Sequence, residues 1–237
     1  MSARTRRRLA ELAERFDLPG EAAPALATLL EILATDPTAP TTITDSVAAA
    51  DAHVADALVA LELEQVRGAG VIADLGSGAG FPGIVLAAAL PWAQVALVEA
   101  GTKKCAFLAR TAEAIGLRNV EVVAARAEEW AAGAGRCDLV TARAVAPLSV
   151  LVEYAAPLLA AGGALVAWKG RRDAVEEADA AAAAVATGLA PVTVRQVRPW
   201  DGAEHLHLHL YVKVGTTPNR FPRRAGMARK RPLRAST

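Results

Sequence analysis

The sequence predicts an α/β fold with a mostly parallel sheet of seven strands, an antiparallel last strand, helices before the sheet and a basic tail after it. Three observations predict this fold class. Short apolar runs rich in β-branched residues alternate with helical stretches from residue 71 onward, as in parallel sheets with helical crossovers. A glycine-rich loop directly follows the first of these runs. The last run, HLHLHLYVKV at 205–214, alternates between polar and apolar residues, which is the period of a strand.

The first part of the chain is expected to be helical. Apolar residues recur at helical spacing in three stretches, over residues 5–16, 21–34 and about 46–65. Pro19 and Gly20 separate the first two stretches, and a Thr/Pro-rich linker over 36–45 precedes the third. We therefore expect an N-terminal helical segment over residues 1–67.

The sheet is expected within residues 68–214. Its strands are predicted over residues 71–75, 94–99, 120–125, 138–142, 164–168, 191–197 and 205–214. Helices are predicted near residues 83–90, 102–115, 147–160 and 172–187. Crossovers between alternating strands and helices are right-handed and give a parallel sheet. The last strand follows its predecessor through the turn residues Pro199-Trp200-Asp201-Gly202, and such a hairpin connection makes it antiparallel to that neighbour.

The charge is distributed unevenly along the chain. The net charge is +1, but residues 1–8 carry four Arg and residues 215–237 carry seven basic residues, with no acid in either stretch. Removing these from 26 basic residues leaves 15 in the middle of the chain against 25 acidic ones. Two basic ends on an acidic body predict a polyanionic partner held by the ends. The tail over 215–237 is expected to be flexible.

Composition excludes several classes of protein and site. No stretch has the roughly 18 apolar residues of a membrane span, and no signal peptide precedes the first helix, so we expect a cytoplasmic protein without a membrane partner.

Cys105 and Cys137 form no CxxC pair and are expected to be buried thiols. His205, His207 and His209 share one strand face, which is expected to be a surface face rather than a metal site. Nothing requires more than a monomer.

The loop VIADLGSGAGFPG at 71–83 fits two cofactor patterns. Residues 78–83 match the GxGxxG of dinucleotide-binding folds, as in an NAD-dependent oxidoreductase. Residues 74–80 match the acid-x-Gly-x-Gly-x-Gly of enzymes that use S-adenosylmethionine (SAM). A carboxylate at Asp74 suits a ligand with a sulfonium and an ammonium and would repel a pyrophosphate. An antiparallel last strand is typical of the Rossmann-like class I SAM-dependent methyltransferases, so both features favour SAM.

Other strand ends add polar groups to the same edge of the sheet, where ligands bind in such folds. Glu99 ends the second strand and can accept hydrogen bonds from ribose hydroxyls, for NAD and SAM alike. Residues 126–130 (RAEEW) follow the third strand, where backbone groups and an acid can meet the adenine edge. Arg143 and Lys169 end the fourth and fifth strands. The sequence therefore predicts an adenosine-type ligand at this edge.

Several stretches together resemble a known family. They are DLGSGAGFPGI (74–84), VEAGTKKCAFL (98–108), ARAEEW (125–130), VTARAVAPL (140–148), WKG (168–170), His53-Val54-Ala55-Asp56 and the tail TPNRFPRRAGMARKRPL (217–233). The chain thus resembles the bacterial ribosomal RNA small-subunit methyltransferase G family, also called glucose-inhibited division protein B. The resemblance runs from about residue 45 to residue 233.

The resemblance implies transfer of a methyl group from SAM to N7 of a guanine in the decoding-region loop of 16S ribosomal RNA (rRNA). The partner would be 16S rRNA or the small ribosomal subunit. The family's cofactor contacts fall on Gly76, Phe81, Ala127, Glu128 and Arg143, to which the loop pattern adds Gly78 and the ribose position adds Glu99. The residues expected to bind RNA are Lys169, Arg220, Arg223, Arg224, Arg229, Lys230 and Arg231.

Guanine N7 has an in-plane lone pair and no proton to lose, so the reaction needs no general base, and no residue is assigned as catalytic. Alignment of the acceptor with the donor can supply about 7–11 kcal/mol of barrier lowering. Trp200 and Phe221 are possible stacking surfaces for unpaired bases, and His53 can orient RNA or cofactor or simply pair with Asp56. Three alternatives stay open: a SAM-dependent methyltransferase on another RNA or a small molecule, an NAD-dependent oxidoreductase, and a non-enzymatic RNA-binding protein.

Overall fold

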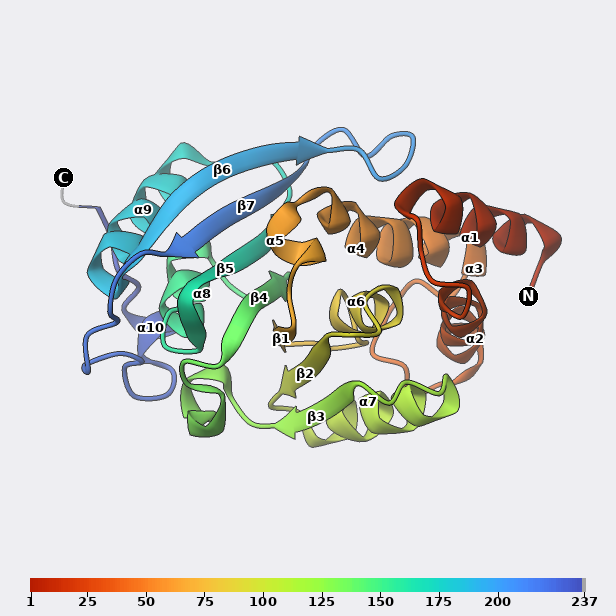
Figure 1. The fold of residues 1–237 in the computed structure, drawn as a ribbon, viewed down its shortest axis with the longest axis horizontal. Helices are drawn as coiled ribbons and strands as arrows, with labels where there is room; N and C mark the ends of the chain where they lie inside the picture. Colours follow the sequence, from red (N-terminus) through yellow and green to blue (C-terminus); the bar gives the residue numbers. More distant parts are fainter. Residues whose placement is uncertain (236–237) are drawn as a thin grey trace.

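The sheet of the computed structural model has seven strands in the order β3-β2-β1-β4-β5-β7-β6 (Figure 1). The structure describes residues 1–235. The strands are β1 (Val71–Leu75), β2 (Gln94–Glu99), β3 (Val120–Ala124), β4 (Cys137–Arg143), β5 (Leu159–Lys169), β6 (Leu189–Val197) and β7 (Leu206–Lys213). Strands β1 to β5 pair in parallel, whereas β7 is antiparallel to both of its neighbours, β5 and β6. The predicted fold class is confirmed.

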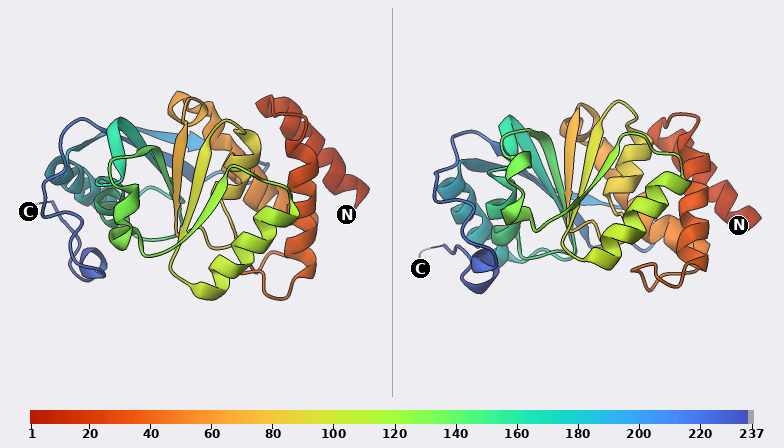
Figure 2. Two further views of the ribbon diagram at one scale, coloured as in Figure 1. Left: turned by 60° about the horizontal axis from the view of Figure 1, so that its bottom comes forward. Right: turned by 90° about the horizontal axis from the view of Figure 1, so that it is seen from below.

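Helices cover both faces of the sheet (Figure 2). The longer helices are α1 (Ala3–Phe16), α2 (Ala22–Thr35), α6 (Gly83–Ala89), α7 (Thr102–Ala114), α8 (Leu148–Ala155) and α9 (Ala174–Thr187). Neighbouring residues of a strand point to opposite faces, so Ile72 belongs to a core with α1, α2, α6 and α7, and Ala73 belongs to a second core with α8 and α9. Two apolar cores therefore hold the carboxyl ends of β1 to β4 in fixed positions.

The third predicted helix is helical but not regular. Its residues form α3 (Ser46–Ala49), a π-helical segment (Ala50–Ala55), α4 (Asp56–Leu58), a 3₁₀ turn (Val59–Glu62) and α5 (Glu64–Arg67). Leu63 adopts an extended backbone with ψ of 127° and separates α5 from the rest. π-Helical segments often occur at functional sites. Here the segment contains His53 and leads directly into Asp56, which both contact Arg143.

The last strand lies inside the sheet instead of at its edge. β7 pairs with β5 on one side, for example Val166 with Leu210, and with β6 on the other. His209, in the middle of this strand, pairs with Ala167 of β5 and Val194 of β6 and is 2% exposed. The prediction that these histidines lie on a surface face is therefore wrong for His209. His205 precedes the strand and is exposed.

The C-terminal segment packs against the α8 face of the sheet domain as far as residue 235. It includes the short helix α10 (Met227–Lys230), and Ala228 within it is 2% exposed. The division into residues 1–67, 68–214 and 215–237, with a flexible tail, stays a prediction. Within residues 1–235, no helix has the length and apolar character needed to span a membrane.

Candidate active site

A pocket of about 280 Å³ opens at the carboxyl ends of β1, β2, β3 and β4. Its lining comes from each of these strand ends, from α8 and from the C-terminal segment: Leu75, Gly76, Val98, Glu99, Ala100, Lys104, Ala125, Arg126, Ala127, Glu128, Ala144, Val145, Tyr154 and Arg229. This is the edge of the sheet where ligands bind in doubly wound folds. The structure therefore brings together Gly76, Glu99, Ala127 and Glu128 from the predicted cofactor set.

The glycine loop leaves space that side chains would fill. Gly76 and Gly78 have φ angles of +67° and +57°, which glycine adopts without strain. A Cβ atom added to Gly76 would lie 2.7 Å from Cγ2 of Val145 on the opposite wall of the pocket. The loop backbone thus reaches the pocket directly, which a bulkier residue at position 76 would prevent.

Glu99 organises the loop as well as the pocket floor. Its Oε2 accepts a hydrogen bond from the Gly78 amide at 3.2 Å, and its Oε1 accepts one from the Gly101 amide at 2.8 Å. The carboxylate is 10% exposed and lies 4.0 Å from the Lys104 Nζ. An ionised carboxylate has about four acceptor sites, so it can hold both amides and still accept from vicinal hydroxyls.

Asp74 does not face the pocket, although the sequence suggested that its charge meets the ligand. The side chain is completely buried. Its Oδ1 accepts a hydrogen bond from Thr141 Oγ1 at 2.9 Å, and its Oδ2 accepts one from the Gly83 amide at 3.1 Å. Burial raises the pKa of Asp74 to about 6, against the lowering effect of these hydrogen bonds. Asp74 therefore ties the loop and the start of α6 to β4 from beneath.

The loop after β3 supplies the far wall of the pocket. Ala127 and Glu128 lie in a single 3₁₀ turn (Ala127–Glu129) that follows Arg126. Glu128 Oε1 accepts a hydrogen bond from the backbone amide of Gly226 at 2.9 Å. Burial and then the charge of Glu128 raise the pKa of the neighbouring Tyr154, and the charge of Arg229 opposes this effect. This wall is therefore built jointly by β3, α8 and the C-terminal segment.

Arg143, at the end of β4, occupies a polar cluster beside the pocket instead of its lining. Its Nη1 donates to Asp56 Oδ2 at 2.7 Å and to the Ala52 carbonyl at 3.0 Å, and its Nη2 lies 3.2 Å from His53 Nδ1. The guanidinium also lies over the Phe81 ring, 5.3 Å from its centroid. Arg143 thus joins the glycine loop to the N-terminal helical segment.

His53 stacks on Phe81 within this cluster, with ring centroids 4.4 Å apart. Burial, followed by the charge of Arg143, lowers the pKa of His53 to about 4. Thr41 Oγ1 lies 3.0 Å from Nε2, so the linker before α3 also holds the ring. Burial raises the pKa of Asp56, with Arg143 opposing it, and Asp56 Oδ1 has no hydrogen-bond partner among the described residues. A neutral imidazole is therefore held behind the loop.

The predicted RNA-binding residues fall into two groups. Lys169 is half-buried and forms a 2.6 Å ion pair with Glu176, and Arg223 and Arg229 are bound to the sheet domain. The second group is exposed on the C-terminal segment, as Arg229 also is, and consists of Arg220, Arg224, Lys230 and Arg231. Of the suggested stacking residues, Phe221 is only 7% exposed and offers no free ring face. Any phosphate contacts would thus come first from the exposed group.

Sequence reasoning missed Tyr154, Lys104 and Val145 as pocket residues. Tyr154 lies inside a predicted helix, and its sequence context contains no functional pattern. Lys104 lies in the stretch VEAGTKKCAFL (98–108), and the resemblance of this stretch to the family could have indicated it as a pocket residue. Tertiary packing alone places Val145 opposite Gly76.

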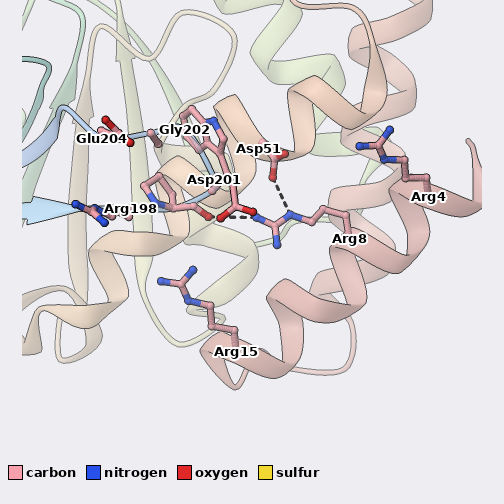
Figure 3. A pocket seen from close by; sticks show the side chains of 11 residues that line it. Arg4, Arg8, Arg15, Asp51, Arg198, Asp201, Gly202 and Glu204 are labelled. Atoms are coloured by element: carbon pink, nitrogen blue, oxygen red, sulfur yellow. Dashed lines mark hydrogen bonds and ion pairs between the residues drawn. The ribbon is translucent and has the colours of Figure 1, made fainter.

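A second hollow, of about 630 Å³, lies between α1 and the loop from β6 to β7 (Figure 3). Its arginines are Arg4, Arg8, Arg15 and Arg198, with Trp200 in the same lining. Acidic groups balance much of this charge: Arg8 pairs with Asp51 at 2.7 Å, and Asp201 and Glu204 also line the hollow. The hollow is therefore a mixed-charge surface away from the cofactor pocket.

The chain is similar to known proteins over most of its length. A family model described as rRNA small subunit methyltransferase G matches residues 38–206. The protein named ribosomal RNA small subunit methyltransferase G in Rubrobacter xylanophilus is 44% identical over 188 residues, which cover 77% of this chain and 72% of the relative. Its namesake in Chloroflexus aggregans is 41% identical over 196 residues, covering 81% and 82%.

Solved structures of other methyltransferases are similar in fold alone. A SAM-dependent O-methyltransferase from Thermotoga maritima superposes with a TM-score of 0.52 at 17% identity, covering 69% of this chain and 66% of that one. Its similarity supports the class I SAM-dependent methyltransferase fold that the strand order already indicates.

Proposed function

The chain belongs to the rRNA small subunit methyltransferase G family and is a SAM-dependent methyltransferase, and from this premise we propose that it methylates N7 of a guanine in the decoding-region loop of 16S rRNA. The pocket at the ends of β1 to β4 carries the proposal, because it combines an open glycine loop with an acid at the ribose position. We further propose that the protein acts in the cytoplasm as a monomer on 16S rRNA or the small ribosomal subunit.

The residues present fit SAM. Gly76 leaves the space that a Cβ atom would fill, and the Glu99 carboxylate can accept from ribose hydroxyls while it holds the amides of Gly78 and Gly101. Ala127 and Glu128 line the end of the pocket expected to receive the adenine. When bound, SAM supplies an electrophilic methyl group on a sulfonium.

The protein's part in the reaction is binding and alignment. Guanine N7 loses no proton on methylation, so the site needs no general base, and the neutral His53 with its low pKa is consistent with a supporting role. Alignment of the two reacting atoms can account for about 7–11 kcal/mol of the barrier. Arg143, Phe81 and His53 are proposed to hold the glycine loop in the shape that this alignment requires.

The exposed basic residues are proposed to bind RNA phosphates. Arg224, Lys230 and Arg231 lie on the same segment as Arg229, which lines the cofactor pocket. Phosphate contacts there would bring RNA to the mouth of the pocket. Such contacts release counterions, so RNA affinity should fall steeply with salt.

The first test is transfer of labelled methyl from SAM to purified small ribosomal subunits and to naked 16S rRNA. The modified base is mapped by strand cleavage specific for N7-methylguanine. One labelled guanine in the decoding-region loop supports the proposal. SAM binding without transfer to either substrate would contradict it and point to another RNA or a small molecule.

A further inference from the structure

The C-terminal segment forms part of the cofactor pocket. Arg229, from α10, lines the pocket together with Gly76 and Glu99. Its Nη2 donates a hydrogen bond to the Val145 carbonyl at 2.9 Å, on the wall that faces Gly76. A guanidinium has five N–H donors, so Arg229 can bind Val145 and still donate to an occupant of the pocket.

A second contact joins this segment to a predicted cofactor residue. The Gly226 amide donates to Glu128 Oε1 at 2.9 Å, and Glu128 lines the pocket. Tyr154 lines the same pocket as Glu128 and Arg229. The position of the Glu128 side chain therefore depends on whether the C-terminal segment is in place.

An anchor outside the pocket fixes the segment to α8. Arg223 Nε donates to Glu153 Oε1 at 2.8 Å, and its Nη2 donates to Oε2 of the same carboxylate. The Glu153 side chain is only 1% exposed, whereas that of Arg223 is 25% exposed. Bidentate pairs of this kind are among the stronger polar contacts. Ala228 adds an apolar contact to the core under α8.

We propose that residues 218–231 act as a clasp that completes the SAM pocket, with Arg229 and Glu128 at the pocket and the Arg223–Glu153 pair as the anchor. The inference rests on the proposed SAM assignment of this pocket. A ligand that contacts only the docked form of a segment shifts the population toward that form. SAM should therefore hold the clasp in place, and the docked clasp should retain SAM.

The experiment measures SAM and S-adenosylhomocysteine binding by calorimetry in the absence of RNA. The full-length variants are Arg229→Ala at the pocket, Arg223→Ala and Arg223→Lys at the anchor, and Arg234→Ala as the control. Arg234 has the same charge and lies just beyond the clasp, and its exposed side chain makes no hydrogen bond within residues 1–235. Circular dichroism confirms that each variant is folded.

Arg229→Ala should weaken binding about three- to tenfold, as loss of one or two hydrogen bonds predicts. Arg223→Ala should weaken SAM binding although Arg223 does not line the pocket, and Arg223→Lys should lie between that variant and wild type. Arg234→Ala should bind SAM as wild type. Amide hydrogen exchange over residues 218–231 should slow when SAM is added to the wild type and change less in Arg223→Ala.

The clasp would be overturned if both Arg229→Ala and Arg223→Ala bound SAM with wild-type affinity. It would also be overturned if amide hydrogen exchange over residues 218–231 of the wild type did not change when SAM is added. If the wild type itself bound no SAM, the cofactor assignment would fail instead, so the two failures are distinguishable. Equal loss of SAM affinity in Arg234→Ala would show a general effect of positive charge and would also reject the clasp.

Discussion

Gly76→Ala tests the glycine loop most directly. Two costs arise from the structure: an alanine must adopt a φ of +67°, and its Cβ must lie 2.7 Å from Cγ2 of Val145. The left-handed backbone costs about 1–2 kcal/mol, and the overlap adds about 1–3 kcal/mol unless Val145 moves. The free energy of unfolding should therefore fall by roughly 2–5 kcal/mol in total.

Gly116→Ala is the matched control. Gly116 has a φ of +76°, but a Cβ added there meets no atom within 4 Å in the described structure. This variant should incur only the backbone cost, about 1–2 kcal/mol. The difference between the two variants measures the overlap with Val145. Adding Val145→Ala to Gly76→Ala should recover most of that difference, which a double-mutant cycle reports as a coupling free energy.

The assays are urea unfolding followed by circular dichroism and calorimetric titration with SAM. Gly76→Ala should weaken SAM binding by at least about tenfold, or 1.4 kcal/mol, because its new methyl group enters the pocket wall. Gly116→Ala should bind SAM as wild type. If Gly76→Ala costs no more than Gly116→Ala and binds SAM normally, the contact between the loop and Val145 does not shape the pocket.

Three further predictions concern charge. Glu99→Gln keeps the size of the side chain but removes the charge, and should weaken SAM binding by about 1–3 kcal/mol in the same titration, whereas the exposed Glu113→Gln should not. The pKa of His53 is lowered from 6.5 to about 4, so its burial contributes stability above pH 6.5 that is lost as the pH falls toward 4. The pKa of Asp74 is raised from 3.8 to about 6, so its contribution is present below pH 3.8 and is lost as the pH rises through 6. Between about pH 4 and pH 6, the free energy of unfolding of His53→Gln should therefore fall as the pH rises, because the Asp74 contribution remains. The free energy of unfolding of Asp74→Asn should rise with pH over the same range, because the His53 contribution remains. If urea unfolding shows the same direction of change in both variants, the two pKa shifts are wrongly attributed to these residues. Arg231→Ala should reduce the slope of log affinity against log salt for 16S rRNA by about one, and an unchanged slope would show that Arg231 makes no phosphate contact.

Local sequence pattern was sufficient for the strands and the glycine loop. Alternation of apolar runs and helices predicted every strand of the sheet, because the pattern reflects burial along each strand. The loop and Glu99 were also predictable, since both lie at strand ends that must meet at one edge of a parallel sheet. The π-helical segment at Ala50–Ala55 was not, because helical periodicity alone cannot distinguish it from a regular helix.

The sequence could not show which acid faces the pocket. Asp74 and Glu99 both end strands beside the loop, yet Asp74 is completely buried and Glu99 lines the pocket. Thr141 on the neighbouring β4 and the amide of Gly83 decide this difference, because they donate hydrogen bonds to the Asp74 carboxylate beneath the loop. These partners are 67 and 9 residues away from Asp74 along the chain.

The sequence by itself determined the α/β class, the position of the cofactor loop and the basic character of the C-terminal segment, because these depend on residue types and short-range spacing. Only the tertiary structure decided that β7 lies between β5 and β6, that Arg143 joins the loop to the N-terminal helical segment, and that Arg229 lies in the pocket wall. The physical reason is that each of these features depends on contacts between residues far apart in the chain, such as Arg229 with Val145 and Arg223 with Glu153. Such contacts leave no periodic signal in the sequence and form only when the two cores pack on the sheet.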